Sequence, residues 1–489
     1  MAAAPDGLLL VLALLVPLSG LPASLLLPAR LGPPILLAQL AAGMAVAVAL
    51  ARAVLRAGAP ITYALGGWQP PLGVLLRADG LSAVMLLASC TIVGAVALYS
   101  WEPSDDGAAS RRQQLFWVLL AALWAGLCLV FLASDLFTLF VGLEILTFAA
   151  IPLVGLDGRT PTLKAALDYL VYALLGSLLY LLGVALIYGA HGVLDIGLLG
   201  ARGHADRASL LAAALITAGL AAKSALWPLH FWLPPAHGGA SPPVSALLSA
   251  LVVKASVFLL LRLWFAAMPE LPGGAAGQVL AFLGAAAVVI GGVQALRQER
   301  LKLLVAYSTV AQLGYLFIVF AFGEADGPRV LRQAWLGGTM QIAAHAVAKA
   351  AMFMAVGLMA EALGHDRIAG LGGLVRLRPV SLAAFAIGGM SLMGLPPSGG
   401  FVAKWFLLYA SVASGRWWWG AAILTGGLFT GAYLYRVLAA AFATPATPLP
   451  SPPPDRRREA VVLALALASL GLGVLPLPAL GLALIGGGP

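Results

Sequence analysis

The sequence has few charged residues: Lys, Arg, Asp and Glu make up 10% of its 489 residues, whereas 62% are hydrophobic. Soluble domains carry about 25% charged residues. A single soluble core also stops growing at about 250–300 residues, and the apolar runs here continue to the end of the chain. This composition excludes an ordinary soluble protein. The net charge of +9 is not a signal for nucleic acid, because the arginines lie mostly between the apolar runs.

Cysteine is nearly absent, since the chain has only Cys90 and Cys128, both in apolar runs. Without a CxxC motif or a Cys/His cluster, we expect no disulfide framework and no zinc or iron–sulfur site. Glycine-rich phosphate-binding motifs on a strand–helix unit are missing too, so nucleotide binding has no support. We therefore expect no cofactor, no metal and no catalytic or redox centre in this chain. Whether it is part of a larger enzyme stays open.

Long apolar runs dominate the sequence. A helix needs about 20 apolar residues to span hydrocarbon about 30 Å thick. The first run could be a signal peptide, but it lacks a basic start and contains Asp6, so we favour a retained helix. The pattern predicts an all-α integral membrane protein with about fourteen transmembrane helices. They are expected at 7–27, 34–55, 78–100, 115–134, 136–156, 165–189, 209–231, 243–265, 276–296, 302–322, 334–360, 380–409, 417–441 and 460–482.

The basic residues outside the apolar runs are unevenly distributed between the loops. If the N-terminus lies outside, fifteen of them fall in inner loops and nine, including Arg77 and Arg262, in outer ones. Positive residues accumulate on the cytoplasmic side of a membrane. The bias predicts that both termini of this multi-pass protein lie on the outer face. We expect the membrane to be the inner membrane of a bacterium.

Two of the apolar runs are interrupted. Residues 224–243 hold four prolines beyond Pro228, and residues 394–400 read GLPPSGG. Broken helices at membrane depth occur where they are buried in protein or line a watery cavity. Paired breaks in two halves point to inverted repeats around a transport path. We expect two inverted five-helix repeats, helices 4–8 and 9–13, with helices 7 and 12 broken. The predicted domains are 1–113 (flanking helices 1–3), 114–265 (first repeat), 266–442 (second repeat) and 443–489 (proline-rich loop and helix 14).

The chain has only six lysines against twenty-two arginines, and four of the lysines lie inside apolar runs. Arginine stays protonated under essentially all conditions, whereas a buried lysine can lose its proton. A site that handles protons needs the second kind of side chain. The four lysines are Lys223, Lys254, Lys349 and Lys404.

Position along the helices indicates depth. Lys254 lies eleven residues after Pro243 and eight before Arg262, which is about 12–16 Å from each. Glu144 is the one carboxylate expected to be deep. An isolated charge at the bilayer centre costs about 2.5–3.5 kcal/mol, so we expect Glu144 to pair with Lys223.

The histidines leave alternatives open. His230 and His237, in the interrupted stretch, are either interfacial anchors or proton relays. His345 lies deep, and we favour a relay over a structural role. Lys349 lies one turn from His345 and is either a further relay or part of a structural ion pair.

Several stretches resemble one known family: the antiporter-like membrane subunits of respiratory complex I, of multisubunit Mrp-type cation/proton antiporters and of membrane-bound hydrogenases. The resemblance is carried by GGWQPPLGVLLRADGLSA (66–83), FTLFVGLEILTFAAIPLVG (137–155), KSALWPLHFWLPPAH (223–237), SPPVSALLSALVVKA (241–255), LKLLVAYSTVAQLGY (301–315), HAVAKAAMFMAVG (345–357) and GLPPSGGFVAKW (394–405). It implies fourteen helices with two inverted repeats. The D-type subunits of the Mrp antiporters are the most similar, followed by the M and N types of complex I.

The resemblance also implies roles. Glu144, Lys223, Lys254 and Lys404 match the glutamate and the lysines of helices 5, 7, 8 and 12, and His345 matches the histidine that joins the two half-channels. The sequence departs from the family at Pro235, where an Asp is usual, and at Ala344, where an Asn is frequent.

These observations favour proton or cation/proton translocation as one subunit of a multisubunit membrane complex. The other partners expected are protons, sodium or potassium ions and the lipid bilayer. One alternative is a stand-alone secondary transporter of an organic solute, which would need a pocket with convergent recognition groups. Another is a membrane scaffold, which would leave the deep charges unexplained.

Overall fold

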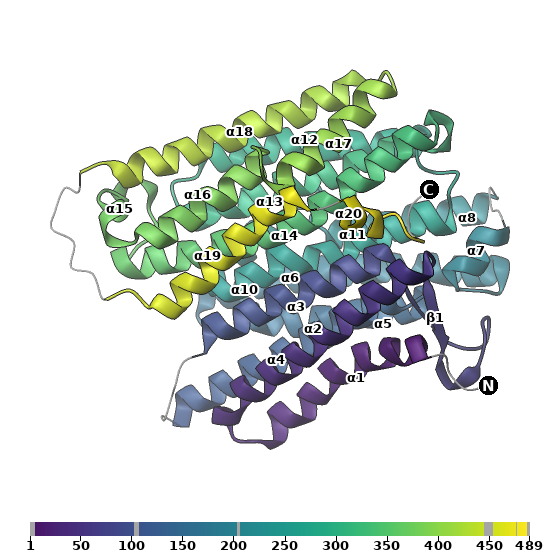
Figure 1. Cartoon of the computed structure of the whole chain (residues 1–489), viewed down its shortest axis with the longest axis horizontal. Helices are drawn as coiled ribbons and strands as arrows, with labels where there is room; N and C mark the ends of the chain where they lie inside the picture. The colour runs from purple at the N-terminus through teal and green to yellow at the C-terminus, as the bar shows by residue number, and fades with distance from the viewer. Residues whose placement is uncertain (1–4, 102–106, 203–205, 445–452, 476, 487–489) are drawn as a thin grey trace.

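The structure is a computed structural model and describes residues 5–101, 107–202, 206–444, 453–475 and 477–486. In this part of the chain, eleven helices are long and apolar enough to cross a membrane, and they run side by side in one bundle (Figure 1). Nine are single helices: α1 (Pro5–Leu26), α2 (Gly32–Ala57), α3 (Gly80–Ser100), α4 (Gly107–Leu132), α5 (Leu136–Val154), α6 (Thr160–His191), α12 (Ala275–Arg297), α14 (Pro328–Leu363) and α18 (Trp417–Phe442).

Two of the eleven are composite. The first combines α10 (Pro242–Leu247), the π-helix η3 (Leu248–Val252), α11 (Val253–Arg262) and the π-helix η4 (Leu263–Ala267); the second joins α13 (Leu301–Ile318) to the 3₁₀ turn η5 (Val319–Ala321). In the first composite helix and in α14, 100% of the most hydrophobic 18-residue stretch is buried inside the bundle. In α18, 33% of that stretch is buried. The centre of the bundle therefore consists of these two helices, with α13 packed against α14.

The other three predicted runs are interrupted. Helix 7 consists of α8 (Arg207–Lys223) and, after a turn, α9 (Leu233–Gly239), and helix 12 of α16 (Pro379–Met393) and α17 (Gly399–Ala413). Both predicted breaks are confirmed. The single helix predicted at 460–482 is wrong, because α19 (Arg456–Gly471) gives way to η8 (Leu472–Val474) and α20 (Leu477–Leu482). The backbone there lies against the break of helix 12: a Cβ on Gly473 would meet the Pro397 carbonyl oxygen at 1.8 Å.

Two short elements were not predicted. An antiparallel hairpin pairs β1 (Ile61–Ala64) with β2 (Leu75–Ala78), and α7 (Ile196–Arg202) lies between α6 and α8. Four-residue strands are too short to show a clear alternation of polar and apolar side chains. We call the end of the bundle that carries the hairpin, α7 and α20 the hairpin end.

The start of α1 and the end of α20 both lie at the hairpin end (Figure 1). The opposite end carries α15 (Leu374–Leu377) and the start of α19. The proline-rich loop predicted at the start of 443–489 has its central part, 445–452, outside the described residues.

Candidate functional site

The predicted pair of Glu144 and Lys223 is present. Lys223, the last residue of α8, places its Nζ 3.0 Å from Glu144 Oε1 and 3.1 Å from Thr147 Oγ1. Glu144 and Thr147 lie three residues apart on α5 and therefore share one face of that helix. Ser177 of α6 donates a further hydrogen bond to the Glu144 carboxylate. The carboxylate thus joins three helices at one point.

Glu144 lies nearer the surface than its position in the apolar run suggests. Its side chain is 16% exposed, against 5% for Lys223. It lines a hollow of about 380 Å³ on the side of the bundle, otherwise bounded by apolar residues of α4 and α5. The ion pair therefore connects a lateral surface of the bundle with the buried end of α8.

Lys254 is completely buried in α11. Its ammonium donates to the backbone carbonyl of Ser249 in the π-helix η3, and no described carboxylate lies within ion-pair distance of it. The Ser249 hydroxyl lies 2.8 Å from Thr309 Oγ1 on α13. π-Helical turns are rare and are frequently found at functional sites.

Three polar residues follow each other at four-residue intervals on α14 and share one face of it: Gln341, His345 and Lys349. Lys349 donates to the Val305 carbonyl of α13 at 2.8 Å and to the hydroxyl of Ser308. His345 is 1% exposed, and neither of its ring nitrogens has a hydrogen-bond partner among the described residues.

Lys404 occupies the break in helix 12. Its Nζ lies 2.5 Å from the Leu392 carbonyl oxygen and 2.9 Å from that of Met393, at the end of α16. The last carbonyls of a helix lack partners within the helix, so the break provides acceptors for the ammonium. The ammonium also lies 4.7 Å from the centre of the Tyr315 ring, a cation–π contact.

Two glutamines link Lys404 to α14. Gln312 of α13 donates to the Leu392 carbonyl at 3.1 Å, which Lys404 also uses, and accepts from Gln341 at 3.0 Å. Gln341 lies one turn from His345 on the same face of α14. The glutamines thus bridge the lysine of the second half and the central histidine.

Polar side chains from η3, α11, α13, α14 and α17 therefore lie in sequence through the centre of the bundle. The Thr309 hydroxyl donates to the same Val305 carbonyl as Lys349, which joins the Lys254 contacts to those of α14. His345 lies between Gln341 and Lys349 on the same face of α14. We call this set the central polar network: Lys254, Ser249, Thr309, Ser308, Lys349, His345, Gln341, Gln312 and Lys404. No hydrogen bond among the described residues joins it to the Glu144–Lys223 pair.

Of the two other predicted histidines, the structure brings one to this network. His237 in α9 is fully buried and stacks on Phe353 of α14 with ring centroids 4.6 Å apart. Lys349 Nζ lies 6.0 Å from the centre of the same Phe353 ring, and neither ring nitrogen of His237 has a hydrogen-bond partner among the described residues. His230 instead stacks on Phe231, whose side chain is 62% exposed, and is not part of the network.

Lys302, one of the two lysines not counted as deep, was missed as a site residue. It is half-buried at the start of α13, donates to the Ala240 carbonyl just beyond α9, and lines a hollow of about 710 Å³ at the end opposite the hairpin. The hollow gives the region around His237 an opening to that end of the bundle. Its other charged or titratable lining residues are Arg112, Asp157, Arg159, Arg300, Glu361, His365 and Asp366.

The uncharged members of the network were missed as well. Ser308, Thr309 and Gln312 lie at helical spacing in the stretch AYSTVAQ, which is the signal that could have found them. Within the described residues, no group of three His, Cys, Asp or Glu side chains is close enough to hold a metal ion. The site offers lysines, histidines and hydroxyls in sequence, an arrangement suited to passing protons.

Comparison with known proteins agrees with this geometry. Residues 133–430 match the family described as NADH:quinone oxidoreductase/Mrp antiporter, transmembrane. NADH-quinone oxidoreductase subunit N of Desulforudis audaxviator is 34% identical over 410 residues, which cover 83% of this chain and 79% of that protein. The D subunit of the Na(+)/H(+) antiporter of Alkalihalophilus pseudofirmus is 30% identical over 382 residues, covering 77% and 75%.

A solved structure shares the architecture over almost the whole length. A chain of the Mrp complex from Dietzia sp. DQ12-45-1b superposes with a TM-score of 0.86 at 26% identity, covering 98% of this chain and 96% of that one. The family match spans more than half of the sequence and includes the network and the Glu144–Lys223 pair. This chain therefore belongs to the NADH:quinone oxidoreductase/Mrp antiporter family of transmembrane subunits.

Proposed function

We propose that this chain translocates protons through the central polar network as one membrane subunit of a multisubunit complex. Glu144 and Lys223 form a switching ion pair, Lys254 and Lys404 load and release protons, and His345 connects the two halves. His237 and Lys349 serve as further relays. The observation that carries this proposal is the position of His345 on α14, between Lys349 and Gln341. Lys349 shares the Val305 carbonyl with Thr309, on the Lys254 side, and Gln341 bonds to Gln312, on the Lys404 side.

Lys302 and its hollow provide the entry from the end opposite the hairpin. Lys302 donates to the Ala240 carbonyl, three residues after His237. His237 stacks on Phe353, whose ring centre lies 6.0 Å from Lys349 Nζ. A proton that enters the hollow can therefore reach the network through groups that accept and release protons. Following the charge bias of the loops, this end is the cytoplasmic one, and the hairpin end with both termini is the outer one.

The two halves act as inverted repeats, 114–265 and 266–442. In the first, Lys223 ends the segment before the break of helix 7; in the second, Lys404 lies in the segment after the break of helix 12. Ion sites at paired broken helices are typical of transporters built from inverted repeats.

The partners supply the driving energy. Relatives of this chain are named as subunits of a sodium/proton antiporter and of NADH-quinone oxidoreductases. We favour cation/proton exchange against sodium or potassium in a bacterial inner membrane, with electron transfer in a partner subunit as the second possibility. Glu144 faces the lateral hollow, the side from which a neighbouring membrane subunit would influence the ion pair.

A reconstitution experiment tests the function. The complex purified through this chain is placed in liposomes with a pH-sensitive dye, and sodium, potassium or NADH with a quinone is added in turn. We expect proton movement with at least one of these drivers, and none when Lys404 is replaced by Ala. Solute uptake by the isolated chain, without partner subunits and without proton movement, would favour the stand-alone transporter instead.

Replacing Lys223 by Arg distinguishes a switching pair from a static one. Lys223→Arg keeps the positive charge beside Glu144 but cannot release a proton at accessible pH. We expect proton transport to fall by about tenfold or more, equivalent to at least about 1.4 kcal/mol in the limiting step. The exposed Lys164→Arg in α6 is the matched control. Near-normal transport by Lys223→Arg would mean that the pair serves structure alone.

A further inference from the structure

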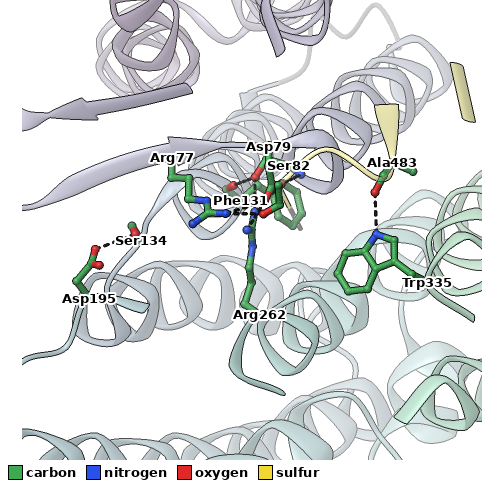
Figure 2. A network of polar contacts seen from close by, with 10 residues as sticks. Arg77, Asp79, Ser82, Phe131, Ser134, Asp195, Arg262, Trp335 and Ala483 are labelled. Atoms are coloured by element: carbon green, nitrogen blue, oxygen red, sulfur yellow. Dashed lines mark hydrogen bonds and ion pairs between the residues drawn. The ribbon is translucent and has the colours of Figure 1, made fainter. Parts of the chain in front are cut away.

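A second buried ion pair lies at the hairpin end (Figure 2). Arg262 donates through both terminal nitrogens to the carboxylate of Asp79, with Nη2 at 2.7 Å from Oδ1. Asp79 is 0% exposed and Arg262 7%. The charge pattern of the sequence had placed Arg262 in an outer loop. Its partner lies 183 residues earlier in the chain, so the pairing is not visible in the local sequence.

Arg262 belongs to the helix that carries Lys254. It is the last residue of α11, eight residues and therefore about 12 Å beyond Lys254. The segment between them is bounded by the π-helices η3 and η4. A contact that fixes Arg262 thus fixes the hairpin end of the segment on which Lys254 is mounted.

The partner side of the pair is rigid. Asp79 is the N-cap of α3 and accepts from the Ser82 backbone at 3.0 Å. Arg262 also donates to Ser82 Oγ at 2.8 Å, and that hydroxyl donates to the Phe131 carbonyl of α4 at 2.7 Å. The Phe258 ring lies under the guanidinium at 5.0 Å. The pair therefore ties α11 to α3 and α4.

The C-terminal segment, residues 480–486, closes over the pair. The Gly80 amide donates to the Ile485 carbonyl at 2.9 Å, and Arg77 of β2 donates to the Gly486 carbonyl. From the other half, Trp335 of α14 donates through its indole to the Ala483 carbonyl at 2.7 Å (Figure 2). A Cβ on Gly80 would meet the Leu482 carbonyl oxygen at 1.6 Å, so only glycine permits this approach.

The charges in this cluster are balanced. Arg77 lies 3.9 Å from Asp79, and a second carboxylate, Asp195, acts on Arg77 while accepting from Ser134 at 2.9 Å. Burial and the nearby Arg262 lower the pKa of Arg77, but an arginine keeps its proton in a protein. Two guanidinium groups facing two carboxylates form a fixed arrangement, in contrast to the lysines of the network.

We propose that Asp79 and Arg262, covered by residues 480–486, form a latch that positions the Lys254-bearing segment and closes its hairpin end. The role of Lys254 in transport rests on the proposed function, but its position does not. The latch therefore predicts a structural result that can be measured without transport: Lys254 is sealed from the hairpin end while the pair is intact.

The experiment measures the accessibility of position 254. Lys254→Cys is introduced into the full complex with Cys90 and Cys128 replaced by Ala, and a charged maleimide is applied from the hairpin end. The double variant Asp79→Asn/Arg262→Gln removes both charges together, so neither stays buried without its partner, and Asn keeps the helix cap. We expect it to raise the labelling rate of the introduced thiol about tenfold by local opening.

Two controls separate the latch from general loosening. Arg56→Gln, an exposed substitution at the end of α2, should not change the labelling of the thiol at position 254. Lys404→Cys, in the second half, should be labelled at the same rate with and without the double substitution. An assembled double variant in which the thiol at position 254 stays as protected as before would overturn the proposal.

A milder variant decides the matter if the double variant does not assemble. Trp335→Phe removes the indole N–H that holds Ala483 to α14, together with part of the buried ring, and leaves the ion pair in place. We expect about a threefold increase in labelling at position 254, in keeping with the loss of one hydrogen bond. No increase would mean that the C-terminal segment has no part in closing this end. In the transport assay with Lys254 present, the pH profile of Arg262→Lys should differ from that of the wild type. Lysine cannot donate the two parallel hydrogen bonds that Asp79 accepts from Arg262.

Discussion

Lys254→Ala is expected to abolish proton transport while the complex still assembles. The ammonium is the only charged group that α11 contributes to the central polar network, and its contacts run from Ser249 through Thr309 to α14. Without it, the hydroxyls that remain cannot hold a proton at neutral pH. We expect a loss of at least about a hundredfold in dye-monitored proton movement, equivalent to about 2.8 kcal/mol.

Assembly should survive because the charge has no carboxylate partner among the described residues. Burying a lone charge in the membrane costs about 2.5–3.5 kcal/mol, so its removal relieves that cost. Lys254→Met fills the volume better than Ala and should give the same transport defect. The exposed Lys164→Ala is the matched control and should transport normally. Normal transport by an assembled Lys254→Met complex would exclude Lys254 from the path.

The sequence predicted those features that depend on composition and on single residues in apolar runs. The eleven membrane-spanning helices of the described residues, the breaks at helices 7 and 12 and the burial of Lys254, Lys349 and Lys404 all follow from hydropathy and from proline. The contact between Glu144 and Lys223 could be predicted because deep charges are few and need partners. Scarcity of charge makes pairing in a membrane protein easier to infer than in a soluble one.

Features that depend on packing between distant segments were not predictable. Asp79 and Arg262 each stand at a helix end, where an exposed loop position is the natural reading, and only the folded bundle buries both. Gln312 and Gln341 are uncharged, and their pairing needs the register of α13 against α14. Lys302 follows a loop directly in sequence but faces the hollow beside α9.

The outer-loop position expected for Arg262 was wrong, since Arg262 is buried, as is Arg378. The physical distinction between arginine and lysine still holds. Arg262 is buried where a carboxylate meets it with two hydrogen bonds. Lys254, Lys349 and Lys404 instead contact carbonyl and hydroxyl oxygens, which do not hold the proton in place as a carboxylate would. The charges of Asp79 and Arg262 thus fix each other at the hairpin end, whereas the lysines for which we propose proton exchange lie in the centre.

The Glu144–Lys223 pair gives the second large effect, because the Lys223 ammonium has the carboxylate and the Thr147 hydroxyl as its described partners. Glu144→Gln should lower transport strongly, and Glu144→Asp, which shortens the reach by one methylene, should lower it less. Lys223→Ala should lower transport at least as much as Glu144→Gln.

The double variant Glu144→Gln/Lys223→Ala should be no worse than Lys223→Ala alone, because both substitutions disable one step and the effects of residues in contact are not additive. Measured as proton flux per assembled complex, the cycle should give a coupling on the order of 1–3 kcal/mol. Ser177→Ala, which removes only the third contact to the carboxylate, is the matched mild variant. Losses that simply add in the double variant would show that the two side chains, although 3.0 Å apart, act in separate steps.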